Sequence, residues 1–207
     1  MIELVTTDGI FRLDGGEWEV TNNIWLVGDD KEVIVIDAAH DAGAIVQAVH
    51  GRKVAAIALT HGHNDHINAA AALQEAVDAP ILLHPADHML WKDVYSGRMP
   101  DRDLADGDVL RAGAAELGVV HTPGHSPGGC CFVLGPDGGH VFSGDTLFCG
   151  GPGATGRSHS DFPTIVESIR SRLLALPPET VVHTGHGDTT TIGAEAPNLD
   201  EWLRRGH

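Results

Sequence analysis

Residues 60–66 read Thr60-His61-Gly62-His63-Asn64-Asp65-His66, and they decide how the rest of the chain is interpreted. This cluster directly follows the apolar run 54–59, which has the length and composition of a buried strand. Imidazole and carboxylate side chains are the usual protein ligands of zinc and of non-haem iron. His61 and His63 alternate along an extended turn and can bind one ion, whereas Asp65 and His66 lie on the next bend and can face a second ion. This one turn therefore predicts half of a two-metal site.

Three further segments offer a carboxylate or an imidazole beside glycines in a matching setting. His125 lies in a turn rich in proline and glycine that follows a strand-like run. Asp145 and His186 each follow another strand-like run, at 139–143 and 180–184. Loops that follow strands are where rigid scaffolds usually carry reactive groups. All four turns are therefore candidate parts of the site.

Taken in order, these residues make the sequence resemble the metallo-β-lactamase superfamily of hydrolases. The closest resemblance is to single-domain proteins of the glyoxalase II (hydroxyacylglutathione hydrolase) type, and it covers residues 60–187. It implies an α/β fold, a four-layer αβ/βα sandwich in which two facing mixed sheets carry helices outside and the site lies at one edge between the sheets. The matching signature is His61, His63, Asp65, His66, His125, Asp145 and His186.

The resemblance also implies a role for each of these residues. His61, His63 and His125 would bind a first metal ion. Asp65, His66 and His186 would bind a second, and Asp145 would bridge the two. Two zinc ions are the expected cofactor, with iron or manganese as other options. A hydroxide held by the ions would attack a polarised carbonyl or phosphoryl centre, and Asp65 would orient it and accept its proton.

The remaining sequence predicts an α/β chain with strands first and then mixed strands and helices, in two halves. The expected strands are 10–13, 17–20, 23–27, 32–37, 54–59, 81–83, 108–112, 115–121, 130–134, 139–143 and 180–184. The expected helices are 41–50, 67–77, 161–176 and 196–205, with a short helix and loop within 85–106. No repeat or linker interrupts the chain, so residues 1–207 are expected to form one domain.

Composition narrows the cellular setting and the partners. The chain has 29 acidic and 13 basic residues and a formal net charge of -16, and such a surface repels the phosphate backbone of nucleic acids. The N-terminus lacks the pattern of a signal peptide, and no apolar stretch approaches the length of a membrane span. The three cysteines show no pairing pattern, and Cys130 and Cys131 are expected in the core. A cytoplasmic enzyme with a small-molecule substrate is expected, whereas the oligomeric state stays open.

The expected reaction is hydrolysis of a thioester of a small thiol. The glycine-rich stretch 148–157 ends in Arg157, which matches the arginine of the family, although the stretch is longer than in glyoxalase II. Few residues follow His186, so we expect the helical domain that helps glyoxalase II to hold glutathione to be missing. These two departures speak against a strict preference for glutathione, and the expected thiol is of glutathione or mycothiol type. His159 is expected either at the pocket rim or on the surface.

Two other reactions stay open. A persulfide dioxygenase with one iron would use His61, His125 and Asp145 as a facial triad. A lactonase, or another ester hydrolase of the superfamily, would share the ligand set. Zinc β-lactamases with a cysteine at the position of Asp145 are disfavoured. Asp37, at the end of its strand, is a candidate either to orient a ligand histidine or to shape a turn.

Overall fold

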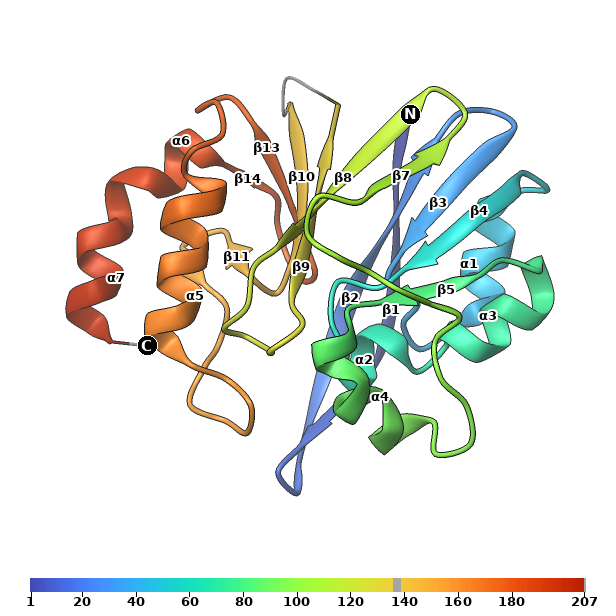
Figure 1. The fold of residues 1–207 in the computed structure, drawn as a ribbon, viewed down its shortest axis with the longest axis horizontal. Coiled ribbons are helices and arrows are strands. Elements are labelled where there is room, and N and C mark those ends of the chain that lie inside the picture. The colour runs from blue at the N-terminus through green and yellow to red at the C-terminus, as the bar shows by residue number, and fades with distance from the viewer. Residues whose placement is uncertain (136–138, 207) are drawn as a thin grey trace.

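The computed structural model describes residues 1–135 and 139–206, which form two six-stranded sheets that face each other (Figure 1). The strand orders are β1-β2-β3-β4-β5-β6 and β14-β13-β10-β9-β8-β7, and β11 and β12 form a small separate hairpin. The strands are β1 (Ile2–Leu13), β2 (Gly16–Gly28), β3 (Glu32–Ile36), β4 (Lys53–Ala58), β5 (Ile81–Leu83), β6 (Arg102–Asp103), β7 (Val109–Ala112), β8 (Ala115–His121), β9 (Cys130–Leu134), β10 (His140–Gly144), β11 (Leu147–Phe148), β12 (Gly151–Pro152), β13 (Val181–Thr184) and β14 (Thr190–Thr191).

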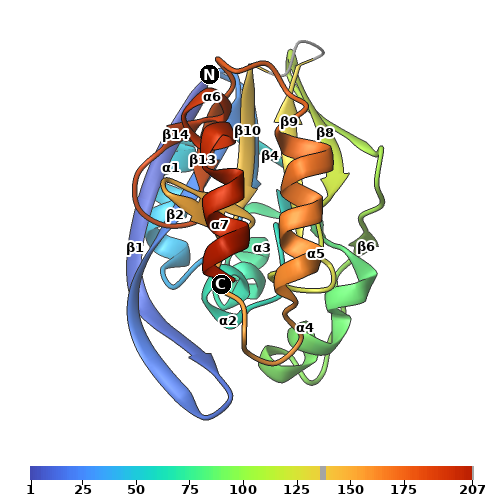
Figure 2. The same cartoon turned by 90° about the vertical axis from the view of Figure 1, so that its left-hand side faces the viewer.

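Helices cover the outer face of each sheet, which completes the four layers that the sequence predicts. The α-helices are α1 (Ala42–Val49), α2 (Asn64–Ile67), α3 (Ala70–Val77), α4 (His88–Val94), α5 (Phe162–Ser168), α6 (Ile192–Glu195) and α7 (Leu199–Arg205). Short 3-10 turns at Pro85–Asp87 and Ala196–Asn198 and a π-helical turn at Ile169–Leu173 extend three of them. Figure 2 shows α5 and α7 in front of the second sheet.

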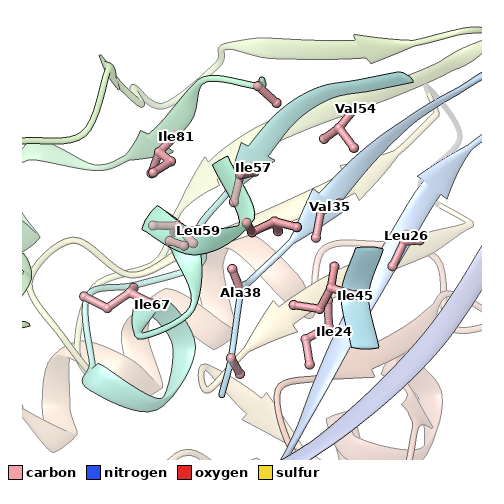
Figure 3. Packing of buried hydrophobic residues seen from close by; sticks show 14 of the residues in the cluster. Ile24, Leu26, Val35, Ala38, Ile45, Val54, Ile57, Leu59, Ile67 and Ile81 are labelled. Atoms are coloured by element: carbon pink, nitrogen blue, oxygen red, sulfur yellow. The ribbon is translucent and has the colours of Figure 1, made fainter. Parts of the chain in front are cut away.

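Three hydrophobic layers hold the four structural layers together. The first joins the outer face of the first sheet to its helices, and Figure 3 shows Val35 and Ile57 of the sheet beside Ile45 of α1. The second fills the space between the sheets, and the third joins the second sheet to α5 and α7 through side chains such as Trp202. Side chains alternate between the faces of a strand, so Val35 of β3 packs in the first layer and its neighbour Ile34 packs in the second.

Local sequence signals explain where several elements begin and end. Asp14 and Gly15 both have positive φ, at 52° and 78°, as the tight turn between β1 and β2 requires. The carboxylate of Asp41 accepts the N–H of Ala44 at 3.0 Å and caps α1. At the other end of α1, His50 adopts the left-handed conformation before Gly51. The predicted helix 41–50 is thus confirmed within one residue at each end.

The structure differs from the sequence prediction in several places. The strands expected at 17–20 and 23–27 are one long strand, β2, because β1 pairs with it along its whole length and begins already at Ile2. The helix expected at 67–77 begins only at Ala70, as α3, because the backbone N–H of Ala69 bonds the carbonyl of Ala38 and separates α3 from the short helix α2. The helix expected at 196–205 starts as a 3-10 turn around Pro197 and is α-helical from Leu199, as α7, and the separate short helix α6 lies directly before it.

The sheet topology brings the candidate site residues to one edge. Strands β3 and β4 are parallel in the first sheet, and β10 and β13 are parallel in the second. The carboxyl ends of parallel strands lie at the same edge of a sheet, where open α/β sheets usually bind ligands. The turns that leave these four strands therefore meet between the sheets. Among the residues described, no helix is both long and apolar enough to cross a membrane.

Candidate metal centre

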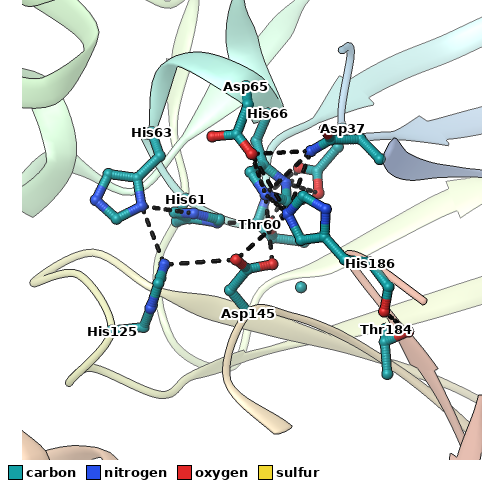
Figure 4. A network of polar contacts seen from close by, with 12 residues as sticks. Asp37, Thr60, His61, His63, Asp65, His66, His125, Asp145, Thr184 and His186 are labelled. Carbon is teal, nitrogen blue, oxygen red and sulfur yellow. Dashed lines mark hydrogen bonds and ion pairs between the residues drawn. The ribbon is translucent and has the colours of Figure 1, made fainter. Parts of the chain in front are cut away.

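The seven candidate ligands converge in one buried cluster (Figure 4). Their potential ligand atoms fall into three groups of three, and within each group the atoms lie within 4.8 Å of one another. The groups are His61, His63 and His125; His61, His66 and Asp145; and Asp65, His66 and His186. The first and third groups are the two ligand sets that the family resemblance implies, and Asp145 lies between them.

Four of the five histidine rings in the cluster are held by one ring nitrogen, which leaves the other nitrogen to act as a ligand. In His61, Nδ1 lies 3.0 Å from Thr60 Oγ1, and in His66 it lies 2.9 Å from Asp37 Oδ2. In His125 and His186, Nδ1 donates to the backbone carbonyls of Ala154 and Thr21, both at 2.8 Å. An N–H on Nδ1 leaves a lone pair on Nε2. In the neutral rings, all four Nε2 atoms therefore point a lone pair into the cluster.

His63 is the exception among the five histidines. Its Nδ1 faces the cluster, 3.0 Å from His61 Nε2 and 3.0 Å from His125 Nε2, and its Nε2 is buried without a hydrogen-bond partner. Two ligands of a tetrahedral zinc ion with bonds of about 2.1 Å lie about 3.4 Å apart. The observed spacings between facing nitrogens are close to that value, so the first group fits one ion.

Asp145 connects the two ligand sets. Its Oδ1 lies 3.3 Å from His66 Nε2, and its Oδ2 lies 3.5 Å from His186 Nε2 and 3.6 Å from His125 Nε2. In the second set, His186 Nε2 lies 3.2 Å from His66 Nε2 and 3.3 Å from Asp65 Oδ2. One carboxylate thus approaches ligands of both sets, which is the geometry of a bridging ligand.

Burial and charge make this place favourable for a cation. Burial lowers the pKa of His66, yet Asp145, Asp65 and Asp37 together raise that pKa well above its ordinary value. Burial raises the pKa of Asp65, but the charge of His66 and the hydrogen bond from His186 outweigh it and bring the pKa to about 2. Burial lowers the pKa of His63 to about 3, so its ring is neutral. Carboxylate charge gathered in a buried site favours a divalent ion.

Two residues outside the ligand set hold the ligand turns in place. Asp37, a candidate from the sequence, accepts the backbone N–H and the hydroxyl of Thr60 as well as the ring of His66. Asp87, which sequence reasoning missed, is buried and accepts the backbone N–H of Gly62 at 2.8 Å, the backbone N–H of Gly128, and the hydroxyl of Ser126 at 2.7 Å. Asp87 therefore ties the first ligand turn to the second.

Asn22 is a second residue that the sequence analysis missed. It is fully buried on β2, and its Nδ2 lies 3.1 Å from Asp65 Oδ2. The same atom lies 3.3 Å from His66 Nε2 and 3.4 Å from His186 Nε2. It therefore contacts all three members of the second ligand set. Asn22 stands two positions before a long apolar run, and no spacing to another candidate marks it out in the sequence.

A cavity of about 410 Å³ opens beside the second ligand set. Its polar side is formed by Asp65, His125, Asp145 and His186, and its other side by Phe11, Trp18 and Phe148 among others. Arg157 also lines it, with the guanidinium 3.8 Å from the centre of the Trp18 ring. In the described part of the chain the guanidinium stacks on aromatic rings and makes no ion pair.

His159 and several other histidines lie away from the cluster. His159 is exposed and lines a separate surface cavity with the turn between β1 and β2. His121 stacks on His84, and His183 packs between Trp25 and Phe142. None of these histidines belongs to a potential metal group within the described residues. Cys130 and Cys131 are buried in the core, as predicted.

The fold and the cluster together define a protein class, and comparison with known families agrees. Residues 18–186 match the model of the metallo-beta-lactamase superfamily. The chain belongs to this superfamily, whose members are generally metal-dependent hydrolases. The fold and the family predicted from the sequence are both confirmed.

Individual relatives are similar over most of the chain. Hydroxyacylglutathione hydrolase GloC of Haemophilus influenzae is 31% identical over 187 residues, which are 83% of this chain and 87% of the relative. The solved structure of TTHA1623 in a di-iron-bound form is 37% identical, with a TM-score of 0.76, and the match covers 86% of this chain and 93% of that one. The BLEG-1 B3 metallo-beta-lactamase is 29% identical, with a TM-score of 0.78, over 95% of this chain and 99% of that one.

Proposed function

We propose that this protein is a dinuclear metallohydrolase that cleaves thioesters of a small thiol. The observation that carries the proposal is the cavity of about 410 Å³, because aromatic side chains line it together with Asp65, Asp145 and His186. A small thioester can lie along this wall with its carbonyl at the ligand cluster. The 31% identity to a hydroxyacylglutathione hydrolase supports the same substrate class.

Divalent ions bound here would polarise the carbonyl and lower the pKa of a nearby water molecule. The chain's own groups then orient the reactants. The carboxylate of Asp65 faces the cavity and is ionised, so it can accept the proton that the attacking water loses. A thiolate leaves readily because its conjugate acid has a pKa of about 8.5. The cavity therefore needs no further acid for the leaving group.

We expect the chain to bind two metal ions per molecule, with Asp145 as a ligand of both. The three groups of ligand atoms and the spacing between facing nitrogens support this expectation. The measurement is elemental analysis of protein purified without added metal, followed by a crystal structure at full occupancy. Zinc and iron are both compatible with the ligand set, since a relative 37% identical to this chain was crystallised with two irons. A structure with Asp145 remote from both ions would contradict the assignment.

We expect the enzyme to discriminate weakly between thiol carriers. Arg157 is the only lysine or arginine among the described residues that line the cavity, so little positive charge is available to bind a carboxylated carrier. The experiment compares kcat/KM for S-lactoylglutathione with kcat/KM for the same acyl group on a smaller thiol. A preference for glutathione above about 10³-fold, roughly 4 kcal/mol in transition-state binding, would reveal a carrier site elsewhere.

The Arg157→Met variant tests whether Arg157 recognises the thiol carrier and not the acyl group. It should weaken the modest preference for a carboxylated carrier and leave the uncharged carrier unaffected, because the guanidinium is the only fixed cation on that wall. Arg12→Met is the matched control, since Arg12 pairs with Glu17 at an exposed position of the β1–β2 hairpin, which also carries Phe11 and Trp18. If no thioester is cleaved, oxygen uptake with a persulfide or cleavage of a lactone or β-lactam would assign the protein to another branch of the superfamily.

A further inference from the structure

We propose that Asn22 is a positioning residue for the second metal ion, and that His40 and Asn68 fix which end of the Asn22 amide faces the ligands. Asn22 contacts Asp65, His66 and His186 through one nitrogen atom. On the other side, its Oδ1 lies 2.9 Å from His40 Nε2. His40 Nδ1 in turn lies 2.9 Å from Asn68 Nδ2. These three residues form a continuous hydrogen-bonded relay that ends on Asp65.

The direction of every hydrogen bond in the relay follows from its first donor. The backbone N–H of His40 can only donate, and it lies 2.6 Å from Asn68 Oδ1. That contact fixes the orientation of the Asn68 amide, so its Nδ2–H donates to Nδ1 of the His40 ring. A neutral imidazole that accepts at Nδ1 carries its proton on Nε2. His40 therefore donates from Nε2 to Asn22 Oδ1, and the Asn22 Nδ2–H donates to Asp65 Oδ2.

The direction of these hydrogen bonds determines the role of Asn22 at the second metal site. An amide nitrogen has no lone pair to give a metal, so Asn22 is a hydrogen-bond donor there and not a ligand. It fixes the rotation of Asp65, whose Oδ2 faces both His66 and His186. Hydrogen bonds to metal-binding carboxylates typically contribute 10- to 100-fold to metal affinity or activity. The relay thus holds one ligand of the second ion and touches none of the first set.

The surrounding backbone holds the His40 ring in one position. His40 has a φ of 56°, in the left-handed region that non-glycine residues seldom occupy. Gly9 of β1 leaves room for the ring, because a Cβ added there would lie 2.0 Å from His40 Nδ1. Burial lowers the pKa of His40, which keeps the ring neutral at neutral pH. The same turn after β3 carries Asp37, so one turn supplies groups that orient both His66 and Asp65.

The direction of the hydrogen bonds at His40 can be measured in the zinc-loaded protein by long-range proton–nitrogen NMR of the histidine rings. The expected result is a protonated Nε2 and an unprotonated Nδ1 for His40, with its signals assigned by their loss in His40→Gln. Asn68→Asp keeps the acceptor for the backbone N–H and replaces the donor by a second acceptor. In that variant Nδ1 of His40 should become protonated. A protonated Nδ1 in the unaltered protein would overturn the relay.

The effect on the second metal is measured by titrating metal-free protein with zinc in competition with a chromophoric chelator. Asn22→Ala should weaken binding of the second ion by about tenfold or more and leave the first ion unchanged. Gly9→Ala, which displaces the His40 ring without touching a ligand, should also weaken binding of the second ion. Asn64→Ala is the matched control, because the side-chain amide of Asn64 bonds to the backbone of β1 and to no candidate ligand among the described residues.

Each outcome of the titration bears on the proposal alone. If Asn22→Ala and Asn64→Ala lose the same amount of affinity for the second ion, Asn22 is a general structural residue and its role at the second site is refuted. The same holds if Asn22→Ala weakens the binding of both ions. Unchanged affinity in Asn22→Ala would refute it as well. Because the titration and the NMR experiment use no substrate, their results do not depend on which thioester the enzyme cleaves.

Discussion

Replacing Asp65 by asparagine should lower turnover by about 10² or more while the fold stays intact, which is the usual scale for loss of an acid/base group. Asparagine has the same shape but cannot take up a proton. The carboxylate lies in the cavity wall, 3.3 Å from His186 Nε2 and 3.1 Å from Asn22 Nδ2. The measurement is kcat for a thioester in parallel with the metal content of the same sample.

Metal content decides how the Asp65→Asn result is interpreted. If the variant keeps both ions and loses turnover, Asp65 transfers a proton in the reaction. Near-normal turnover with both ions bound would mean that another group accepts the proton. Asp41→Asn is the matched control, because Asp41 only caps α1 at the surface and asparagine caps a helix equally well.

The sequence points to the seven candidate ligands, which the structure brings together, because each of them follows a strand whose own pattern is clear. The run 54–59, for example, is buried strand β4 in nearly the same bounds, and the turn after it carries His61 and His63. A short range of sequence therefore contains both the strand and the ligands. The family resemblance then supplied the partition of the ligands between two ions, which short-range pattern does not contain.

Two of the residues that hold the candidate ligands, Asn22 and Asp87, were missed because their contacts are distant in the sequence. Asn22 bonds to Asp65 across 43 positions, and Asp87 reaches Gly128 across 41. A buried asparagine or aspartate has no periodicity of its own, and only the closed structure shows which backbone groups it satisfies. The length of β1 was missed for a related reason, since its pairing partner β2 determines how far it extends.

Gly185→Ala should abolish most of the activity although it changes no ligand. A Cβ at this position would lie 2.3 Å from Asp145 Oδ1 and 2.9 Å from His66 Cε1. The backbone has little freedom to move away, because the N–H of Gly185 bonds Gly144 at 2.9 Å and its carbonyl accepts the N–H of Asn23 at 2.8 Å. Asp145 must therefore rotate, and a misplacement of about 1 Å at a reacting centre can lower the rate about 10²-fold.

The control for this variant is Gly118→Ala, because a Cβ on Gly118 in β8 meets only Val133 O, at the ordinary contact distance of 3.8 Å. It should keep wild-type turnover and metal content. In Gly185→Ala, turnover should fall by about 10² or more, and the metal titration should show weaker binding at the sites that share Asp145. The result would be contradicted by normal turnover in Gly185→Ala together with a crystal structure in which Asp145 keeps its position. In that case the close packing of Gly185 against Asp145 would not be needed to hold the Asp145 carboxylate in place.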